Sequence, residues 1–343
     1  MELQMRHYNI ICILAALALV ASACAKVVPD EPGTRSIIGF NTVCTKAVTS
    51  KYPTTVPFRS TAFSYSGTWD ANKSSVTKYI DEELVKYNST YSYWITYDGD
   101  TEKAYSWPGG TTKLTFFSYS PETLKGTVSV TTDGVGISSW DVKTNTGDIL
   151  VADIAQDKTK NESLAGYTGV PTLFKHKLSR IVFQFGIADD ASDDDTKISL
   201  TSIVLNDVCS SGSYSRGGYA DDKWTPSPSP PKSSWSLFAG DLELSKSLSP
   251  DKEFNMIPQS LLATASTHPE LVIGYKLSTD RGVTWESKTA TCYFDENLRQ
   301  ESWEKGKKYT YTIYIGVGQY PIDFDASVAI WSELGGVDVS IGG

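Results

Sequence analysis

The clearest candidate for covalent chemistry is a cysteine near the N-terminus. An apolar run from Ile10 to Ala21 ends in the small residues Ala21-Ser22-Ala23, and Cys24 follows directly. The run is too short to cross a bilayer as a stable helix, which is typical of a secretory signal. A cysteine after such a triplet fits the bacterial lipobox, in which it is acylated. We therefore expect a lipoprotein signal peptide over residues 1–23 and a lipid on Cys24, with an ordinary cleaved signal as the alternative.

No other residue pattern indicates a catalytic or metal centre. His176 and His268 have no carboxylate or cysteine at ligand spacing, and lone histidines are more often structural than catalytic. The chain lacks the G-x-S-x-G, P-loop, H-E-x-x-H and dinucleotide-binding glycine patterns. The acidic run Asp189–Asp195 lacks EF-hand spacing, so a solvated linker near a domain boundary is favoured over a calcium loop. We expect no enzyme activity and no cofactor.

The remaining cysteines match no zinc pattern. Besides Cys24, the mature chain holds Cys44, Cys209 and Cys292. Loss of an N-terminal segment that includes Cys44 would leave Cys209 and Cys292 free to pair. Two small buried thiols without a bond are the favoured interpretation.

Composition sets the broad class. The chain has 343 residues, of which 40% are hydrophobic and 12% aromatic, as in globular β-proteins. Its 31 basic and 40 acidic residues give a net charge of −9, which argues against nucleic acid and anionic lipid as partners. No second apolar run is long enough to span a bilayer, so any membrane attachment is through the lipid.

The elements expected behind Cys24 are a tether and then many short strands. A polar tether, residues 26–34, leads to a strand pattern at Ile37–Val43 and the basic site Thr45-Lys46-Ala47. One helix is expected at Lys78–Tyr87. Short strands at regular spacing favour an all-β fold made of sandwiches. The expected strands are 64–69, 90–97, 114–119, 127–130, 149–152, 170–174, 180–187, 197–205, 235–244, 253–257, 271–277, 289–294 and 308–317.

Two alternating apolar segments close the chain. Phe324, Ala326, Val328 and Ile330 share one face of the first segment. After Gly335-Gly336, a second segment carries Val337, Val339 and Ile341 on one face. A terminal strand of this kind can pair within its own domain or complete the sheet of a neighbouring molecule.

The order of several motifs along the mature chain resembles the Bacteroidetes-type fimbrillin family, whose members build type V pili. The motifs are Ile38-x-Phe40 with Thr45-Lys46-Ala47; Trp107-Pro108 before Leu114-Thr-Phe116-Phe117; Gly147-Asp148-Ile149-Leu150-Val151-Ala152; Phe174-Lys-His176-Lys-Leu178-Ser179-Arg180-Ile181; Met256-Ile257-Pro258-Gln259-Ser260-Leu261; Trp303-x-x-Gly306-Lys-x-Tyr309; and Val328-x-Ile330-Trp331.

The resemblance implies two transthyretin-like β-sandwich domains in tandem, here residues 47–187 and 188–343, preceded by a tether and removable strand at 24–46. It implies an outer membrane lipoprotein at the cell surface, cut by a protease beyond the first strand. Lys46 stands where family members more often carry Arg, and Arg35 is an alternative that precedes the strand.

The cut would open a groove for a strand of another fimbrial subunit, with Phe324, Val328, Ile330, Val337, Val339 and Ile341 as donor-strand candidates. Adhesion to a host protein or glycan would follow. The main alternative is a surface glycan-binding lipoprotein, which exposed coplanar tryptophans would favour. A hydrolase, with two close carboxylates in a cleft, is a third alternative.

Overall fold

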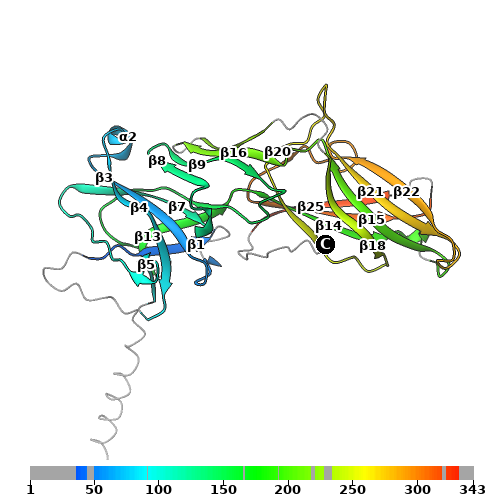
Figure 1. The fold of residues 1–343 in the computed structure, drawn as a ribbon, viewed down its shortest axis with the longest axis horizontal. Helices are drawn as coiled ribbons and strands as arrows, with labels where there is room; N and C mark the ends of the chain where they lie inside the picture. The colour runs from blue at the N-terminus through cyan, green and yellow to red at the C-terminus, as the bar shows by residue number, and fades with distance from the viewer. Residues whose placement is uncertain are drawn as a thin grey trace, which may run out of the picture.

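The structure, a computed structural model, is built almost entirely from β-strands (Figure 1). It describes residues 36–44, 50–90, 92–164, 167–191, 193–217, 221–227, 234–318 and 322–331. Within these ranges the α-helix α2 (Trp69–Asn72) is a single turn, and no helix is long and apolar enough to span a membrane. The all-β class expected from the sequence is confirmed.

The largest sheet closes on itself. Hydrogen bonding runs in the order β13-β10-β7-β3-β4-β5-β1, and β1 pairs with β13 in turn. We call this closed set of strands the ring. Strand β1 completes the ring because it pairs with β13 on one edge and with β5 on the other. Closure leaves no free strand edge in the ring. The strands of this sheet are β1 (Phe40–Cys44), β2 (Ser50–Lys51), β3 (Phe58–Ser66), β4 (Thr77–Asn88), β5 (Tyr93–Asp98), β6 (Thr101–Glu102), β7 (Thr112–Ser120), β10 (Leu150–Ala152), β11 (Ala155–Lys158), β12 (Glu162–Leu164) and β13 (Tyr167–His176).

The ring encloses its own hydrophobic core, and its outer face is covered as well. A four-stranded sheet of β8 (Val128–Thr131), β9 (Gly134–Asp141), β16 (Ser211–Gly217) and β17 (Asp221–Pro226) supplies side chains that cluster with Phe63 of β3 and Phe117 of β7. Strands β3 and β7 are therefore buried on both faces. The core inside the ring contains Ile38, Phe40, Tyr52, Phe58, Ala62, Ile80, Val85, Trp94, Trp107, Leu114, Phe116, Leu150, Ala152, Ala155, Val170 and Phe174.

The second half of the chain forms a sandwich of two four-stranded sheets at the other end of the molecule (Figure 1). Alternate residues of β24 point into its core, where Phe183 stacks on Tyr311 at a centroid distance of 5.4 Å. One sheet contains β19 (Lys252–Met256), β14 (Ser179–Ile187), β24 (Lys307–Ile315) and β25 (Ile322–Ile330). The other contains β18 (Trp235–Glu243), β15 (Lys197–Asn206), β21 (Glu270–Ser278) and β22 (Glu286–Tyr293). Strands β20 (Gln259–Ser260) and β23 (Ser302–Trp303) form a separate pair.

The helix predicted at residues 78–87 was wrong, since these residues lie in β4. The β3–β4 register shifts on either side of Ala62, and Glu82 has a φ of 48°, as in a β-bulge. The extra residues in β4 place its two fully buried side chains at Ile80 and Val85. A spacing of five residues fits neither the period of two of a regular strand nor the 3.6-residue turn of an α-helix.

Two segments lie on the other side of the boundary expected at residue 187. Strand β14 pairs with β19 and β24 of the second half, whereas the β16–β17 hairpin pairs with β9 of the first half. The chain crosses between the halves at Lys177, which is buried. Its ammonium pairs with Asp222 of the hairpin at 2.9 Å, and its carbonyl accepts a hydrogen bond from the Trp224 indole. Burial lowers the pKa of Lys177 to about 8.

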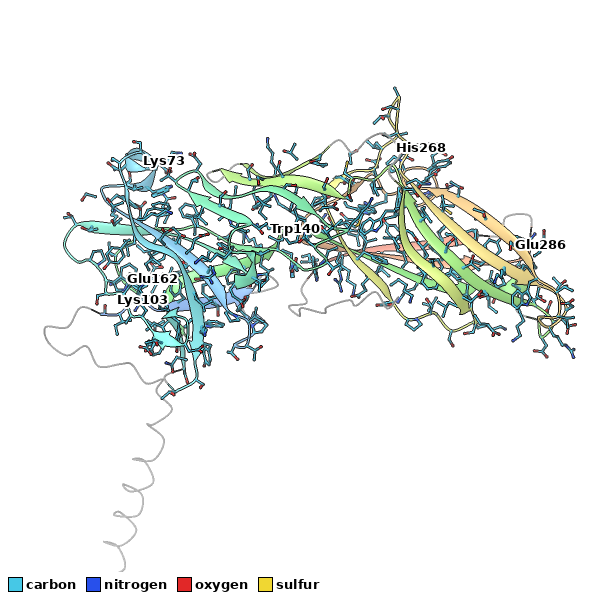
Figure 2. All side chains as sticks on the ribbon, in the orientation of Figure 1. Lys73, Lys103, Trp140, Glu162, His268 and Glu286 are labelled. Carbon is cyan, nitrogen blue, oxygen red and sulfur yellow. The ribbon has the colours of Figure 1, made fainter. Side chains whose placement is uncertain are left out.

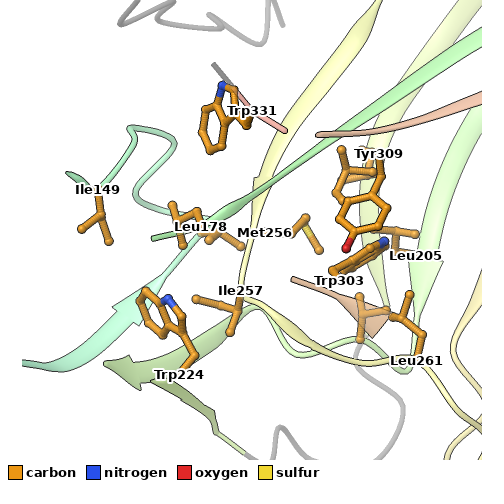
Figure 3. Close-up of a cluster of buried hydrophobic side chains, with 14 of the residues drawn as sticks. Ile149, Leu178, Leu205, Trp224, Met256, Ile257, Leu261, Trp303, Tyr309 and Trp331 are labelled. Carbon is orange, nitrogen blue, oxygen red and sulfur yellow. The ribbon is translucent and has the colours of Figure 1, made fainter. Parts of the chain in front are cut away.

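The two halves meet through a continuous hydrophobic cluster. Ile149 and Leu178 belong to the same cluster of buried side chains as Trp224 of the hairpin and Met256 and Ile257 of the second half (Figure 3). These side chains are almost completely buried. Because burial of an aliphatic or aromatic side chain stabilises a fold by about 1.5–3 kcal/mol, the junction is a packed interface.

Candidate functional site

Strand β1 occupies the gap between β5 and β13. It runs parallel to β13, from Phe40 opposite Val170 to Cys44 opposite Phe174. On its other edge it meets β5 where Phe40 lies opposite Trp94. The strand expected behind the tether is therefore present, and both of its edges are occupied.

Two side chains of this N-terminal segment fill the interior of the ring. Ile38 is 1% exposed and Phe40 is 2% exposed. The Phe40 ring makes edge contacts with Phe58 at 5.6 Å and with Phe116 at 5.9 Å between centroids. Removal of the segment would leave an apolar groove lined by these aromatic rings, with unpaired backbone along β5 and β13.

The backbone just before β1 is also held on both sides. Ile38 N–H donates to the Tyr105 carbonyl at 2.7 Å, and Trp107 N–H donates to the Ser36 carbonyl at 3.1 Å. On the opposite edge, the side chain of Asn161 contacts the backbone of the same segment. Asn161 was not among the residues singled out from the sequence, because the backbone groups of this segment that it contacts are more than 120 positions away along the chain.

The connection between β1 and β2 contains Lys46. Residues 45–49 lie outside the described part of the chain, as do Arg35 and Cys24. A cut after Lys46 would break the chain between β1 and β2. Strand β1 would then be bound to the ring only by hydrogen bonds and packing, since Lys46 follows it and precedes β2.

The C-terminal donor candidates divide into two groups. Val337, Val339 and Ile341 lie outside the described residues. Phe324, Val328 and Ile330 lie on β25, which pairs with β24 along its whole length as the last strand of its sheet.

Their burial differs along β25. Phe324 packs against the core of the second half. Val328 and Ile330 are 50% and 58% exposed. Directly after them Trp331 is buried, and its ring stacks on His176 at 3.9 Å. The end of β25 is therefore fixed at the junction between the halves, while its last apolar side chains are open to solvent.

Both histidines singled out from the sequence have a carboxylate partner that local spacing did not reveal. Nδ1 of His176 lies 2.6 Å from Asp148, and Nε2 of His268 lies 3.0 Å from Asp295. Within the described ranges, no group of three or more His, Cys, Asp or Glu side chains is placed to hold a metal ion. Cys209 and Cys292 are unbonded, and burial raises the pKa of the Cys292 thiol to about 12.

The acidic run Asp189–Asp195 belongs to the second half and begins with a short 3-10 helix, η2 (Asp189–Ala191). It connects β14 to β15 at the far end of the sandwich from Lys177. Asp190 accepts a hydrogen bond from Gly318 N–H at 2.9 Å, and Asp195 pairs with Arg281 at 2.5 Å. The expectation of a linker at the domain boundary was therefore wrong, because β14 belongs to the second half.

The tryptophans do not form an exposed stacking platform. Figure 2 shows Trp140 near the middle of the molecule, and its ring is 5% exposed. Among the nine tryptophans only Trp285, at 43%, is strongly exposed, and Trp235 is partly buried. The exposed coplanar pair that would favour glycan binding is not found among these residues. The buried tryptophans are Trp69, Trp94, Trp107, Trp140, Trp224, Trp303 and Trp331.

Comparison with known proteins agrees with this architecture. A family model described as fimbrillin-like matches residues 57–331. Among solved structures, a fimbrial protein from Bacteroides vulgatus shares 20% sequence identity over 87% of this chain and 100% of that chain, with a TM-score of 0.54. A candidate cell adhesion protein from Bacteroides uniformis shares 16% identity over 86% of this chain and 99% of that one, with a TM-score of 0.51. The search of curated proteins gave no match.

Proposed function

This chain belongs to the fimbrillin-like family, and we propose that it is a structural subunit of a surface fimbria that serves adhesion. One observation supports this most strongly. Strand β1 closes the ring, supplies apolar side chains to its core, and is followed at once by the connection that contains Lys46. Removal of β1 would leave β2 without its partner, whereas β3, β4 and β7 would keep their pairings with one another.

In this proposal the chain is exported as a lipoprotein and is held in the outer membrane, at the cell surface, through Cys24. A protease then cuts after Lys46 and frees β1 to leave. A cut at Arg35 would leave β1 attached to the remainder of the chain, so Lys46 is the effective site. Loss of the lipid-bearing segment would release the subunit from its anchor at the same time.

The opened ring then takes a strand from another fimbrial subunit. Unpaired backbone beside an apolar groove strongly favours strand addition, in which alternate side chains of the new strand enter pockets. Val337, Val339 and Ile341 have the required alternation. Strand β25 would serve as the base of this donor segment, because it stays paired with β24 while Val328 and Ile330 remain accessible.

We also propose that the molecule consists of two sandwich domains. The first contains the ring with the β8-β9-β16-β17 sheet, and the second contains the two four-stranded sheets. The boundary falls at Lys177, with the β16–β17 hairpin returning to the first domain.

The test of the function is polymerisation after proteolysis. Val339→Asp should block assembly, because a charge placed in an apolar pocket costs several kcal/mol unless it is paired. Ser340→Asp is the matched control, since neighbouring residues of a strand point to opposite faces. Ladders on denaturing gels and fibres in electron microscopy would report assembly. Normal ladders from Val339→Asp would exclude the terminal segment as donor, and a wild-type chain that never ladders would exclude self-polymerisation.

A further inference from the structure

The side-chain amide of Asn161 contacts two backbone groups of the N-terminal segment. Its Nδ2 donates to the Ile37 carbonyl at 2.8 Å, and its Oδ1 accepts from Gly39 N–H at 3.2 Å. The same Oδ1 accepts from the indole Nε1 of Trp107 at 3.3 Å. The indole thereby fixes which end of the amide is the acceptor, because Nε1–H can only donate.

This amide takes the place of one residue in a parallel β-ladder. In such a ladder, one residue bonds the carbonyl of position i and the N–H of position i+2 on the facing strand. Ile37 and Gly39 have this relationship. The backbone ladder of β1 with β13 begins one step later, where Val170 N–H donates to the Gly39 carbonyl at 2.7 Å. Asn161 therefore extends the parallel ladder by one rung.

The extension is needed because β13 turns to a different partner at this point. Its residues 167–169 pair with β12 (Glu162–Leu164), so their backbone is used in that hairpin. Asn161 immediately precedes β12 and reaches β1 from there. Glu162, beside it, lies at the end of the molecule opposite Glu286 (Figure 2). The contact between Asn161 and the N-terminal segment therefore belongs to the ring and not to the second half.

The contact also fixes register. Successive residues of a strand direct their N–H and C=O groups to opposite edges, so a one-residue slip would remove both groups from Asn161. The same slip would turn Phe40 out of the core. Backbone recognition by Asn161 and the apolar pocket for Phe40 therefore select the same alignment.

We propose that Asn161 is a register-setting clamp that selects any strand entering the gap between β5 and β13. It requires a free N–H at the position of Gly39 and therefore rejects a proline there. The selection of a donor strand rests on the proposed function, because only a chain that loses β1 has a gap to fill. The candidate segment Val337–Ile341 contains no proline, as the clamp requires.

The first experiment needs no cleavage. Amide hydrogen exchange is measured on the uncut mature chain for wild type, Asn161→Ala and Asn145→Ala. The control residue Asn145 bonds only to its own turn, at Asp141 and Thr144. Loss of the clamp should speed exchange at Gly39 on the order of tenfold, as expected for one lost hydrogen bond. Equal exchange at Gly39 in wild type and Asn161→Ala would overturn the clamp.

The second experiment measures selection. A peptide of residues 36–44, with or without N-methylation at Gly39, is bound to protein cut after Lys46, either wild type or Asn161→Ala. N-methylation should weaken binding to wild type on the order of tenfold, and much less to Asn161→Ala. The same penalty in both proteins would overturn the selection. If neither cut protein takes up peptide, strand exchange fails as a function, and hydrogen exchange at Gly39 in the uncut chain still decides the clamp.

Discussion

Replacement of Phe40 by Ala should loosen β1 without unfolding the rest of the molecule. The Phe40 side chain is buried in the ring core, where it contacts Phe58 and Phe116. Strands β3 and β7 of the ring have further support that does not depend on β1, since they are buried on both faces. The lost packing should therefore appear as easier detachment of β1.

The expected change in the free energy of β1 detachment follows from the burial of the Phe40 side chain. Truncation of a buried Phe to Ala costs about 3–5 kcal/mol. A difference of about 1.4 kcal/mol is tenfold in an equilibrium constant, so detachment of β1 should become more frequent by about two to four powers of ten. This change is large enough to read from amide exchange at Asn41 and Thr42, which lie within β1.

The assay is residue-resolved hydrogen exchange together with a thermal melt of the uncut chain. Phe185→Ala is the matched control, since Phe185 is 0% exposed on β14 of the second half. The control should destabilise the sandwich and leave exchange in β1 unchanged. If Phe40→Ala instead speeds exchange equally in β1, β3 and β7, β1 is an inseparable part of the ring and the reasoning is refuted.

Three further outcomes are expected. Lys177 has its pKa lowered to about 8 by burial, so the unfolded chain binds more protons between pH 8 and 10.5. Relative to Lys177→Met, denaturant titrations should show wild type gaining about 1–2 kcal/mol of stability from pH 7 to 9.5, and a flat difference would contradict the burial effect. Cys24→Ala should abolish incorporation of labelled fatty acid, whereas unchanged labelling would rule out the lipobox. Mild trypsin should give a core that begins at Ala47 by mass spectrometry, and scattered cuts within the body would count against an accessible connection after β1.

The positions of the strands along the chain were more predictable than the pairing of the strands in sheets. Alternation of apolar residues located β1 and the long strands of the second half, because half-buried strands carry a period of two. The same rule failed in β4, where a bulge near Glu82 broke the period. The boundary predicted at residue 187 also placed β14 in the first half, whereas β14 pairs with strands of the second half. The sequence of a strand does not indicate which sheet the strand joins.

The candidate site was predictable only in part. Ile38 and Phe40 marked a buried strand, but closure of the ring depends on pairing with β13, about 130 residues later. The clamp at Asn161 depends on contacts over 122 and 124 positions. A single polar residue in a loop carries no local signal of such a role, and only the folded chain brings it to the backbone that it holds.

The central claim is that β1 is a replaceable strand, and native mass spectrometry of the chain cut after Lys46 tests it most directly. We predict that the fragment ending at Lys46 leaves the core and that cores then join in a series whose links survive denaturing gels. Addition of excess labelled peptide of residues 36–44 should cap the cores and shorten the series. A monomeric core that keeps its fragment in equal amount, even with excess labelled peptide present, would contradict the claim.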